Sequence, residues 1–241
     1  LTVTTDEQGG SAIANASTTT GASMASPGTP TRSGYTFAGW FTASGGGSAI
    51  SFPYAHGQTA NFTLYAQWTA DSLTVTTDEQ GGSAIANAST TTGASMASPG
   101  TPTRSGYTFA GWFTASGGGS AISFPYAHGQ TANFTLYAQW TALTVRTITI
   151  DSGSYSATYN RYATAPTLTS TASAGSGDKT YTSSTTSVCT VDASTGAVAF
   201  VTAGTCTLQA AIASDGVYAS ATSATISISV TYAIGDTGPA G

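Results

Sequence analysis

Few side chains in this sequence have the chemistry of a catalyst. The two histidines, His56 and His128, each lie in the segment PYAHGQ. Hydrolysis by a Ser or Cys nucleophile needs an imidazole base and a third group that orients it. Because Pro and Gly bound this segment, we expect each histidine to be a solvated turn residue, and the sequence offers no reactive cluster around it.

The carboxylates are no better placed for chemistry. Asp6 and Glu7 are adjacent, and adjacent residues of a strand face opposite sides, so they cannot flank one glycosidic bond. The acidic residues nearer the C-terminus lack the DxDxDG spacing of a calcium loop, and Asp192 better fits an Asx-type turn. They are Asp151, Asp178, Asp192 and Asp215. We therefore expect no catalytic residue, no metal and no cofactor.

Aromatic side chains offer one remaining chemistry, the stacking of a sugar. Tyr54 beside His56, and Tyr65 on the outer face of a predicted strand, are the candidates for ligand contact. Two copies of such a site would add avidity. The alternative is that Tyr65 only covers the far side of its sheet. The duplicates of these residues are Tyr126, His128 and Tyr137.

Composition argues against several other classes of function. Charged residues are 6% of the 241-residue chain, against about 25% in an average soluble domain. The net charge is −5 and the five basic residues are scattered singly, whereas nucleic acids and anionic membranes attract clustered cations. No apolar run approaches the roughly 20 residues that span a bilayer. The lack of an initiator Met and of a leader indicates an excised fragment or a processed product.

A long internal repeat sets the domain organisation. Residues 1–70 and 73–142 are identical letter for letter, and only Asp71 and Ser72 separate them. This identity predicts two equal modules, followed by a third at 143–232 and a Gly-rich end at 233–241. Because a two-residue linker leaves little slack, we expect limited bending between the two copies.

Each copy predicts short strands joined by turns. Strands are expected at 1–6, 12–20, 34–41 and 61–70, with a Gly-Gly turn in DEQGGS and a bulge at Gly39. The segment GASMASPGTPTRSG is a predicted crossover that holds at most one helical turn, at 22–25. The aromatic residues of each copy, Trp40 and Trp68 among them in the first, are predicted to form the core that so small a module needs.

The motifs of each copy resemble a known family. VTTDEQGGSAI, PTRSGYTFAGWFT and TLYAQW follow one another in both copies. This order resembles the Listeria-Bacteroides repeat, also called the internalin B-repeat, of bacterial surface proteins. The resemblance implies a small β-grasp-like fold that acts as a spacer or adhesive module, with no catalytic residues. The Gly-rich insert ASGGGSA departs from the commoner pattern, so the resemblance does not fix that loop.

The third segment has the spacing of an all-β sandwich. Strands of five to ten residues alternate with turns rich in Gly, Ser, Asp and Asn. They are predicted in RTITID, PTLTSTAS, TSVCTVD, GAVAFV, GTCTLQAAI and SATISISVTY. The stretch SVCTVDASTGAVAFVTAGTCTLQA resembles bacterial immunoglobulin-like domains, which implies a second kind of surface module.

Both cysteines belong to this segment, on predicted strands that flank GAVAFV. In a small exported domain with few charges, Cys189 and Cys206 are expected to form a disulfide. Two buried free thiols and a metal site are the alternatives. The Gly-rich end at 233–241 fits the three-residue period of collagen, resembles the opening of a further module, or is a disordered tail.

The sequence therefore predicts a mainly β chain, in which two β-grasp-like modules and an Ig-like β-sandwich form an elongated string. The expected function is that of a non-enzymatic extracellular spacer, located on a bacterial cell surface or secreted. The alternative is an adhesive module that binds a glycan or a host surface protein. We expect neither a nucleic acid partner nor membrane insertion of this segment.

Overall fold

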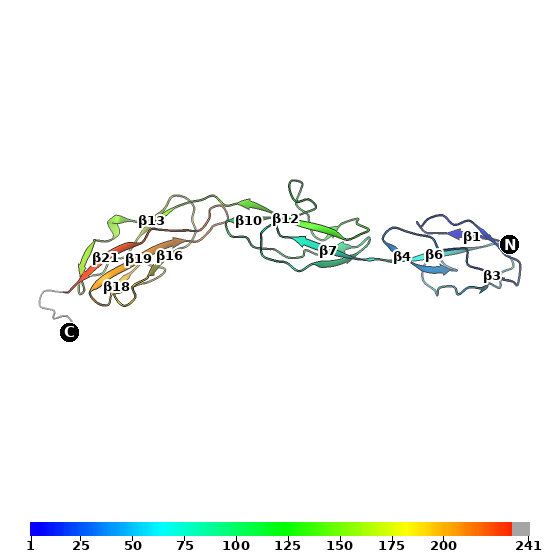
Figure 1. Cartoon of the computed structure of the whole chain (residues 1–241), viewed down its shortest axis with the longest axis horizontal. Coiled ribbons are helices and arrows are strands. Elements are labelled where there is room, and N and C mark those ends of the chain that lie inside the picture. The colour runs from blue at the N-terminus through cyan, green and yellow to red at the C-terminus, as the bar shows by residue number, and fades with distance from the viewer. Residues whose placement is uncertain (233–241) are drawn as a thin grey trace. The chain divides into compact units, whose positions relative to one another are not determined.

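The computed structural model describes residues 1–232, in which short β-strands are joined by long loops (Figure 1). The Gly-rich end at 233–241, with its three predicted alternatives, lies outside the described residues. The chain forms two compact units, Leu1–Pro102 with Ala110–Gln139, and Thr103–Phe109 with Trp140–Gly241. The boundary between the units thus falls inside the second copy of the repeat.

The first copy is built on a four-stranded sheet with the order β2-β1-β6-β4. Its strands are β1 (Thr2–Asp6), β2 (Ala16–Ser17), β4 (Tyr35–Phe41) and β6 (Phe62–Ala70). The two central strands, β1 and β6, are parallel, and the outer pairs are antiparallel. A two-residue ladder between β3 (Ser23–Met24) and β5 (Tyr54–Ala55) closes the module.

The second copy repeats this order as β10-β12-β7-β8. Its strands are β7 (Ser72–Asp78), β8 (Ala88–Thr91), β10 (Tyr107–Phe113) and β12 (Phe134–Ala142), with β9 (Ser95–Met96) paired to β11 (Tyr126–Ala127). Although the two sequences are identical, β8 spans four residues and its counterpart β2 spans two. The same residues therefore extend their ladder further in the second copy.

The predicted hairpin turn is present, but it is centred one residue earlier. Gln8 (φ 49°) and Gly9 (φ 86°) both have positive φ, and Gly10 N–H donates to the Glu7 carbonyl at 3.0 Å. The strand predicted at 12–20 is much shorter, because side chains replace its ladder. The Asn15 side chain accepts from Thr5 N–H, and the Thr5 hydroxyl donates to the Ile13 carbonyl.

The crossover also differs from its prediction in one respect. The helical turn that the sequence allowed at 22–25 is not formed: Ser23 and Met24 are extended and pair with β5, and no α-helix occurs within residues 1–232. The bulge at Gly39 is confirmed by a register shift between β4 and β6 at Phe37 and Gly39. A Cβ at Gly39 would lie 3.0 Å from the Ala49 Cβ, so a larger residue would be crowded there.

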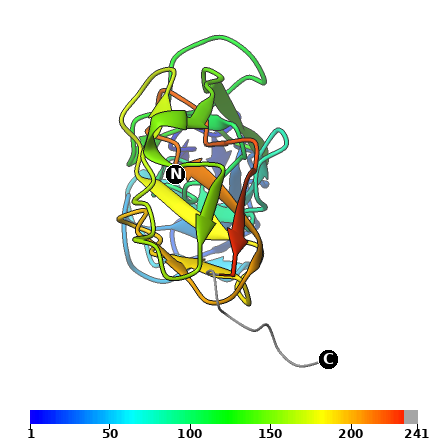
Figure 2. The ribbon, with the colours of Figure 1, turned by 90° about the vertical axis from the view of Figure 1, so that its left-hand side faces the viewer.

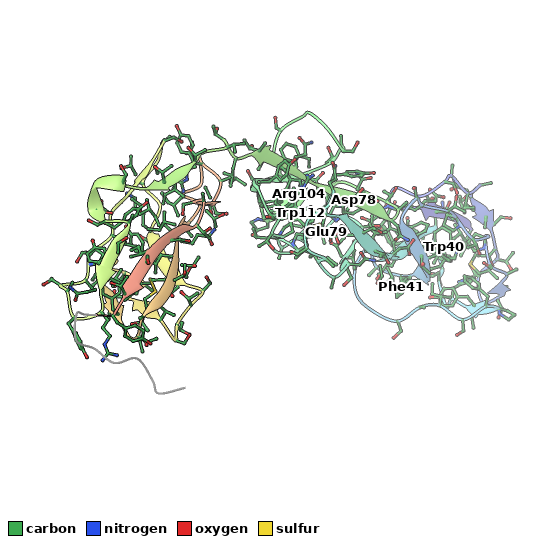
Figure 3. The ribbon with its side chains drawn as sticks, turned by 60° about the vertical axis from the view of Figure 1, so that its left-hand side comes forward. Trp40, Phe41, Asp78, Glu79, Arg104 and Trp112 are labelled. Carbon is green, nitrogen blue, oxygen red and sulfur yellow. A yellow bond between two sulfur atoms is a disulfide. The ribbon has the colours of Figure 1, made fainter. Side chains whose placement is uncertain are left out.

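The aromatic residues form the core of each copy, as predicted. Trp40 is 1% exposed and donates its Nε1–H to the Gly28 carbonyl at 2.7 Å. Trp68 donates to the Glu7 carbonyl at 2.9 Å, and Phe37 packs edge-on against both indoles. Figure 3 shows Trp40 among the side chains of the first copy and Trp112 among those of the second. Trp40 is therefore buried and Trp68 is partly buried, and because both N–H groups have acceptors their burial costs little.

The third module is made of several small sheets around one core. Ile148–Ile150 (β13) pairs with Ser170–Ala172 (β15), and Cys189–Val191 (β17) with Val198–Phe200 (β18). The five-stranded sheet has the order β14-β21-β19-β16, with β20 added to β19. Its members are Thr158–Asn160 (β14), Lys179–Ser183 (β16), Gly204–Ile212 (β19), Ala221–Thr222 (β20) and Ile226–Thr231 (β21); a short 3₁₀ turn, η1, spans Ser152–Ser154.

Each of the six segments predicted to be strands contains one, and they are β13, β15, β17, β18, β19 and β21; the short strands β14, β16 and β20 were not predicted. β19 coincides with GTCTLQAAI, and its burial alternates between Cys206, Leu208, Ala210 and Ile212 on the inner face and partly exposed residues on the other. Figure 2 shows β21, in red, beside the yellow-green β14, and the two strands are parallel. The alternation of period two is what makes these strands predictable.

Replacing Trp40 by Phe should destabilise the first copy by about 1–3 kcal/mol, because the Gly28 carbonyl loses its donor and a void remains. Thermal unfolding followed by tryptophan fluorescence and circular dichroism would measure the loss. The control is Val145→Ala, since Val145 is 86% exposed and its truncation should leave the transition in place. An unchanged melting temperature for Trp40→Phe would contradict the structural role of this indole.

Candidate functional site

The histidine of each copy is buried, so the prediction of a solvated turn residue is wrong. His56 is 5% exposed and His128 is 6% exposed. The His56 Nδ1 accepts from the Gln58 backbone N–H at 3.0 Å, and Nε2 lies 3.2 Å from the Thr18 hydroxyl. Because Nδ1 is an acceptor, the proton is assigned to Nε2, which donates to Thr18 Oγ1.

The surroundings of His56 explain why the turn buries it. The imidazole lies 5.1 Å from the Phe62 ring and 6.2 Å from the Tyr54 ring, centroid to centroid. His128 makes the same contacts with Phe134 and Tyr126. Both nitrogens are engaged within the module, so in this arrangement neither is available as a base for a nucleophile.

The tyrosines predicted to contact a ligand fall into two groups. Tyr54 packs against the core cluster of the first copy, next to Phe52, so its ring is largely a structural element. Tyr65 lies on β6 between the buried Leu64 and Ala66 and is partly exposed. Tyr126 and Tyr137 are the equivalents in the second copy. Tyr65 lies on the outer face of β6, whereas Tyr54 and His56 pack on the core side of the module. The structure therefore does not bring the three side chains together in one site.

The adjacent carboxylates hold the first turn of each copy. Asp6 Oδ1 accepts from Gln8 N–H at 3.0 Å and Glu7 Oε1 accepts from Ile13 N–H at 2.9 Å. Partial burial acts to raise the pKa of Glu7, but the hydrogen bond from Ile13 N–H and the polar side chain of Thr5 outweigh it and lower that pKa. The pKa of Glu79 is lowered in the same way. These carboxylates therefore serve the backbone and face no common substrate position.

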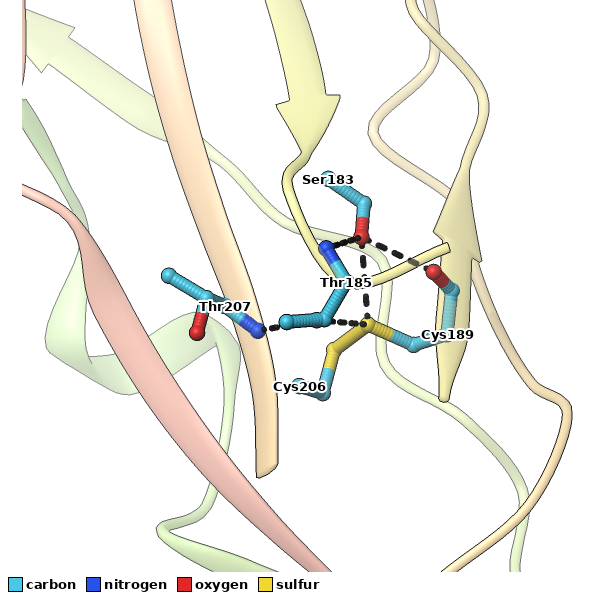
Figure 4. The surroundings of a disulfide bond; sticks show 5 residues. All are labelled: Ser183, Thr185, Cys189, Cys206 and Thr207. Carbon is cyan, nitrogen blue, oxygen red and sulfur yellow. Dashed lines mark hydrogen bonds between the residues drawn. A yellow bond between two sulfur atoms is a disulfide. The ribbon is translucent and has the colours of Figure 1, made fainter. Parts of the chain in front are cut away.

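The predicted disulfide is confirmed in the third module. Cys189 on β17 and Cys206 on β19 are bonded, with 5.5 Å between their Cα atoms, and both are fully buried (Figure 4). The Ser183 hydroxyl donates to the Cys189 carbonyl at 2.8 Å, and Thr207 N–H donates to the Thr185 hydroxyl at 2.8 Å. The bridge thus ties the two-stranded ladder of β17 and β18 to the five-stranded sheet.

Reduction of this disulfide should destabilise the third module by about 3 kcal/mol, because the unfolded chain regains the freedom of the closed loop. Calorimetry with and without a reductant, or of the Cys189→Ala/Cys206→Ala variant, would measure the shift. The two copies of the repeat contain no cysteine, so their transitions act as an internal control. An unchanged third-module transition after complete reduction would contradict the expected effect.

Two aspartates of the third module hold turns through several hydrogen bonds. Asp192 Oδ1 accepts from the backbone N–H and hydroxyl of Thr195 and from those of Ser194, at 2.8 to 3.0 Å. These bonds lower the pKa of Asp192 to about 2. The Asx-type turn predicted at Asp192 is therefore confirmed. Asp215 accepts from Tyr218, Ser176 and Val217 N–H and lies beside Arg146, which lowers its pKa to about 2 as well.

Arg146 is a structural residue that the sequence reasoning missed. Its side chain is fully buried, 3.0 Å from Asp215 Oδ2, and it donates to the carbonyls of Ala219, Ala174 and Ala213. The ring of Tyr218 lies 5.8 Å away. In the sequence Arg146 is a lone basic residue, and the carbonyls it gathers come from distant loops, so no local pattern reveals it.

Lowering the pH from about 4 to 2 should destabilise the third module. Both carboxyls have a folded pKa of about 2, below the roughly 3.9 of an unfolded Asp. Their contribution is therefore complete above about pH 4 and is lost as the pH falls through the folded values. Melting temperatures from pH 7 to 2 would show this. Asp192→Asn should flatten the acid slope, and a slope equal to that of the unsubstituted chain would contradict the assignment.

The third module also carries an open hollow of about 740 Å³, lined by residues 175–180 with Ala193 and Ser194. The Lys179 ammonium beside it donates to the Ser170 carbonyl. Its lining is polar, and its charged residues Asp178 and Lys179 are exposed, so no aromatic ring or buried charge would hold a ligand in one orientation. Within residues 1–232, no three His, Cys, Asp or Glu side chains converge as metal ligands would.

The mixed sheet and the aromatic core of the copies define a small all-β repeat module. The model of the Listeria-Bacteroides repeat domain matches residues 2–67 and 74–139, and the chain belongs to this family. The family is typical of bacterial surface proteins. Comparison with curated proteins returned no match. No helix within residues 1–232 is long and apolar enough to cross a membrane.

Proposed function

We propose that the chain is a non-enzymatic extracellular spacer within a larger bacterial surface or adhesin-like protein. The observation that carries this proposal is that the side chains with reactive or binding chemistry are used inside their own modules. Trp40 and His56 are buried with their ring nitrogens bonded, Glu7 holds a turn, and the cysteines are joined. What the modules present outward is mostly neutral hydroxyl and amide surface.

Two finer assignments of fold belong to this proposal. A β-grasp-like class for each copy is supported by the parallel central pair β1 and β6 with antiparallel strands at either edge, although an extended crossover stands in place of a helix. An Ig-like class for the third module is supported by the disulfide between β17 and β19, which joins strands of separate ladders. Ig-like sandwiches are common in cell-surface domains.

The second candidate function is adhesion through a glycan or a host surface protein. The partly exposed Tyr65 and its equivalent Tyr137 favour it, since tyrosine rings on a sheet face can stack on sugars. Tyr54 is a poorer candidate because its ring packs against the core. The buried His56 and His128 would contribute to a ligand site only by holding the PYAHGQ turn of their copy in place.

A spacer predicts an extended particle in solution. From the size relation for compact domains, each module is roughly 25 to 35 Å across, so three in a row would reach about 90 Å. Small-angle X-ray scattering of the full chain measures its maximum dimension. A maximum dimension close to that of a single sphere of the same mass would contradict the spacer role.

A glycan and host-protein array separates the two functions. If the chain is adhesive, two copies should bind more tightly than one, because the second contact is intramolecular. Tyr65→Ala with Tyr137→Ala should then abolish binding without lowering the melting temperature. Val145→Ala, at an exposed site outside both copies, serves as the control. The spacer role predicts no retained ligand for any of these chains.

A further inference from the structure

Because the two copies are identical, the same residues can be compared next to two different following segments. The first copy is followed by Asp71 and the second by Leu143. In the first copy, Gly34 and Thr36 contact Asp71, the residue that follows the copy, and so lie in space at its C-terminal end. In the second copy the equivalent residues are Gly106 and Thr108, and the residue that follows the copy is Leu143. We call these the first and second joint. Each joint lies within one compact unit of the structure.

The backbone contact of the two joints is the same. In the first joint, Asp71 N–H donates to the Gly34 carbonyl at 3.0 Å, and in the second, Leu143 N–H donates to the Gly106 carbonyl at 2.9 Å. This bond requires no particular side chain in the residue that follows the repeat. The end of the copy therefore holds either an acidic or an apolar successor in the same way.

The threonine hydroxyl of each joint changes its acceptor. Thr36 Oγ1 donates to Asp71 Oδ1 at 2.7 Å, whereas Thr108 Oγ1 donates to the Gly216 carbonyl at 3.2 Å. The chain beyond the first joint then pairs with the second copy. Thr92 N–H donates to the Asp71 carbonyl at 3.0 Å, and the ladder of β7 with β8 begins at Ser72 and Thr91.

Side-chain packing distinguishes the first joint from the second. A Cβ on Gly34 would lie 2.7 Å from Thr92 Oγ1 and 2.8 Å from the Thr131 Cβ, while a Cβ on Gly106 would meet no atom within 4 Å. Ser33 Oγ also donates to Thr131 Oγ1 at 3.2 Å. Thr92 is 7% exposed, whereas its counterpart Thr20 is exposed. The second copy thus covers the end of the first.

We propose that the C-terminal end of the repeat is a docking surface for the next repeat of the same chain. The glycine carbonyl and the threonine hydroxyl bind the linker, and the glycine itself makes room for the two threonines of the following copy. Docking fixes the orientation of adjacent copies, and it does not depend on whether the chain acts as a spacer or as an adhesin. Its failure in a test would leave the proposed function untouched.

Electron paramagnetic resonance tests this docking in the full chain. Spin labels at Thr4→Cys and Thr76→Cys, two exposed strand positions, report the distance between the copies while the native disulfide stays intact. We expect one narrow distance distribution. Gly34→Val should lose it, because the new side chain meets Thr92 and Thr131. Gly106→Val should retain it, since both glycines have nearly the same positive φ, 76° and 79°, and only one is covered.

A second pair of variants keeps the test decisive if the valine at a positive φ unfolds the module. Thr92→Arg places a long cation in the covered position and should lose the narrow distribution. Thr20→Arg makes the same change at the exposed counterpart and should retain it. Circular dichroism checks that each variant is folded. A broad distribution in the unsubstituted chain, or equal effects within both pairs, would overturn the proposal.

Discussion

The burial of hydrogen-bonded aromatic rings is the interaction on which each copy depends. A module of about 70 residues buries little surface and is marginal without a disulfide, a metal or dense aromatic packing. Neither cysteine lies in the copies, so the rings must supply the core. An indole satisfies this need only if its N–H has an acceptor, and the carbonyls of Gly28 and Glu7 provide it. The loops that carry these carbonyls are therefore fixed by the core itself.

Uncharged polar side chains complete what the short strands leave unpaired. Asn15 caps Thr5 N–H, Gln67 donates to the carbonyls of Ala43 and Gly46, and Asn61 accepts from Thr2 N–H. Much of the backbone lies outside regular β-ladders, so its N–H and C=O groups need side-chain partners. A buried backbone group without a hydrogen bond is costly. The low charge and the many hydroxyl and amide groups thus follow from the loop-rich fold. They also leave a surface with few fixed charges to select a partner.

The regular parts of the fold could be predicted from the sequence, because alternation and turn residues are local signals. β19, the bulge at Gly39 and the disulfide between Cys189 and Cys206 all follow from such signals. The extended conformation at Ser23 could not be predicted, since it depends on pairing with Tyr54 and Ala55, far along the chain. The contacts of Arg146 could not be predicted for the same reason, because all its partners lie in distant segments. The turn of His56 has local partners in Tyr54, Gln58 and Phe62, but its Nε2 pairs with the distant Thr18.

The hydroxyl at the end of each copy has a consequence for how such chains can change over generations. Thr36 donates to a carboxylate and Thr108 to a carbonyl, so the hydroxyl of the repeat finds an acceptor in either kind of successor. Recombination that deletes, multiplies or reorders whole units would still yield junctions that close. Letter-for-letter duplication is then tolerated, because the main-chain hydrogen bond at the end of the repeat forms with either successor.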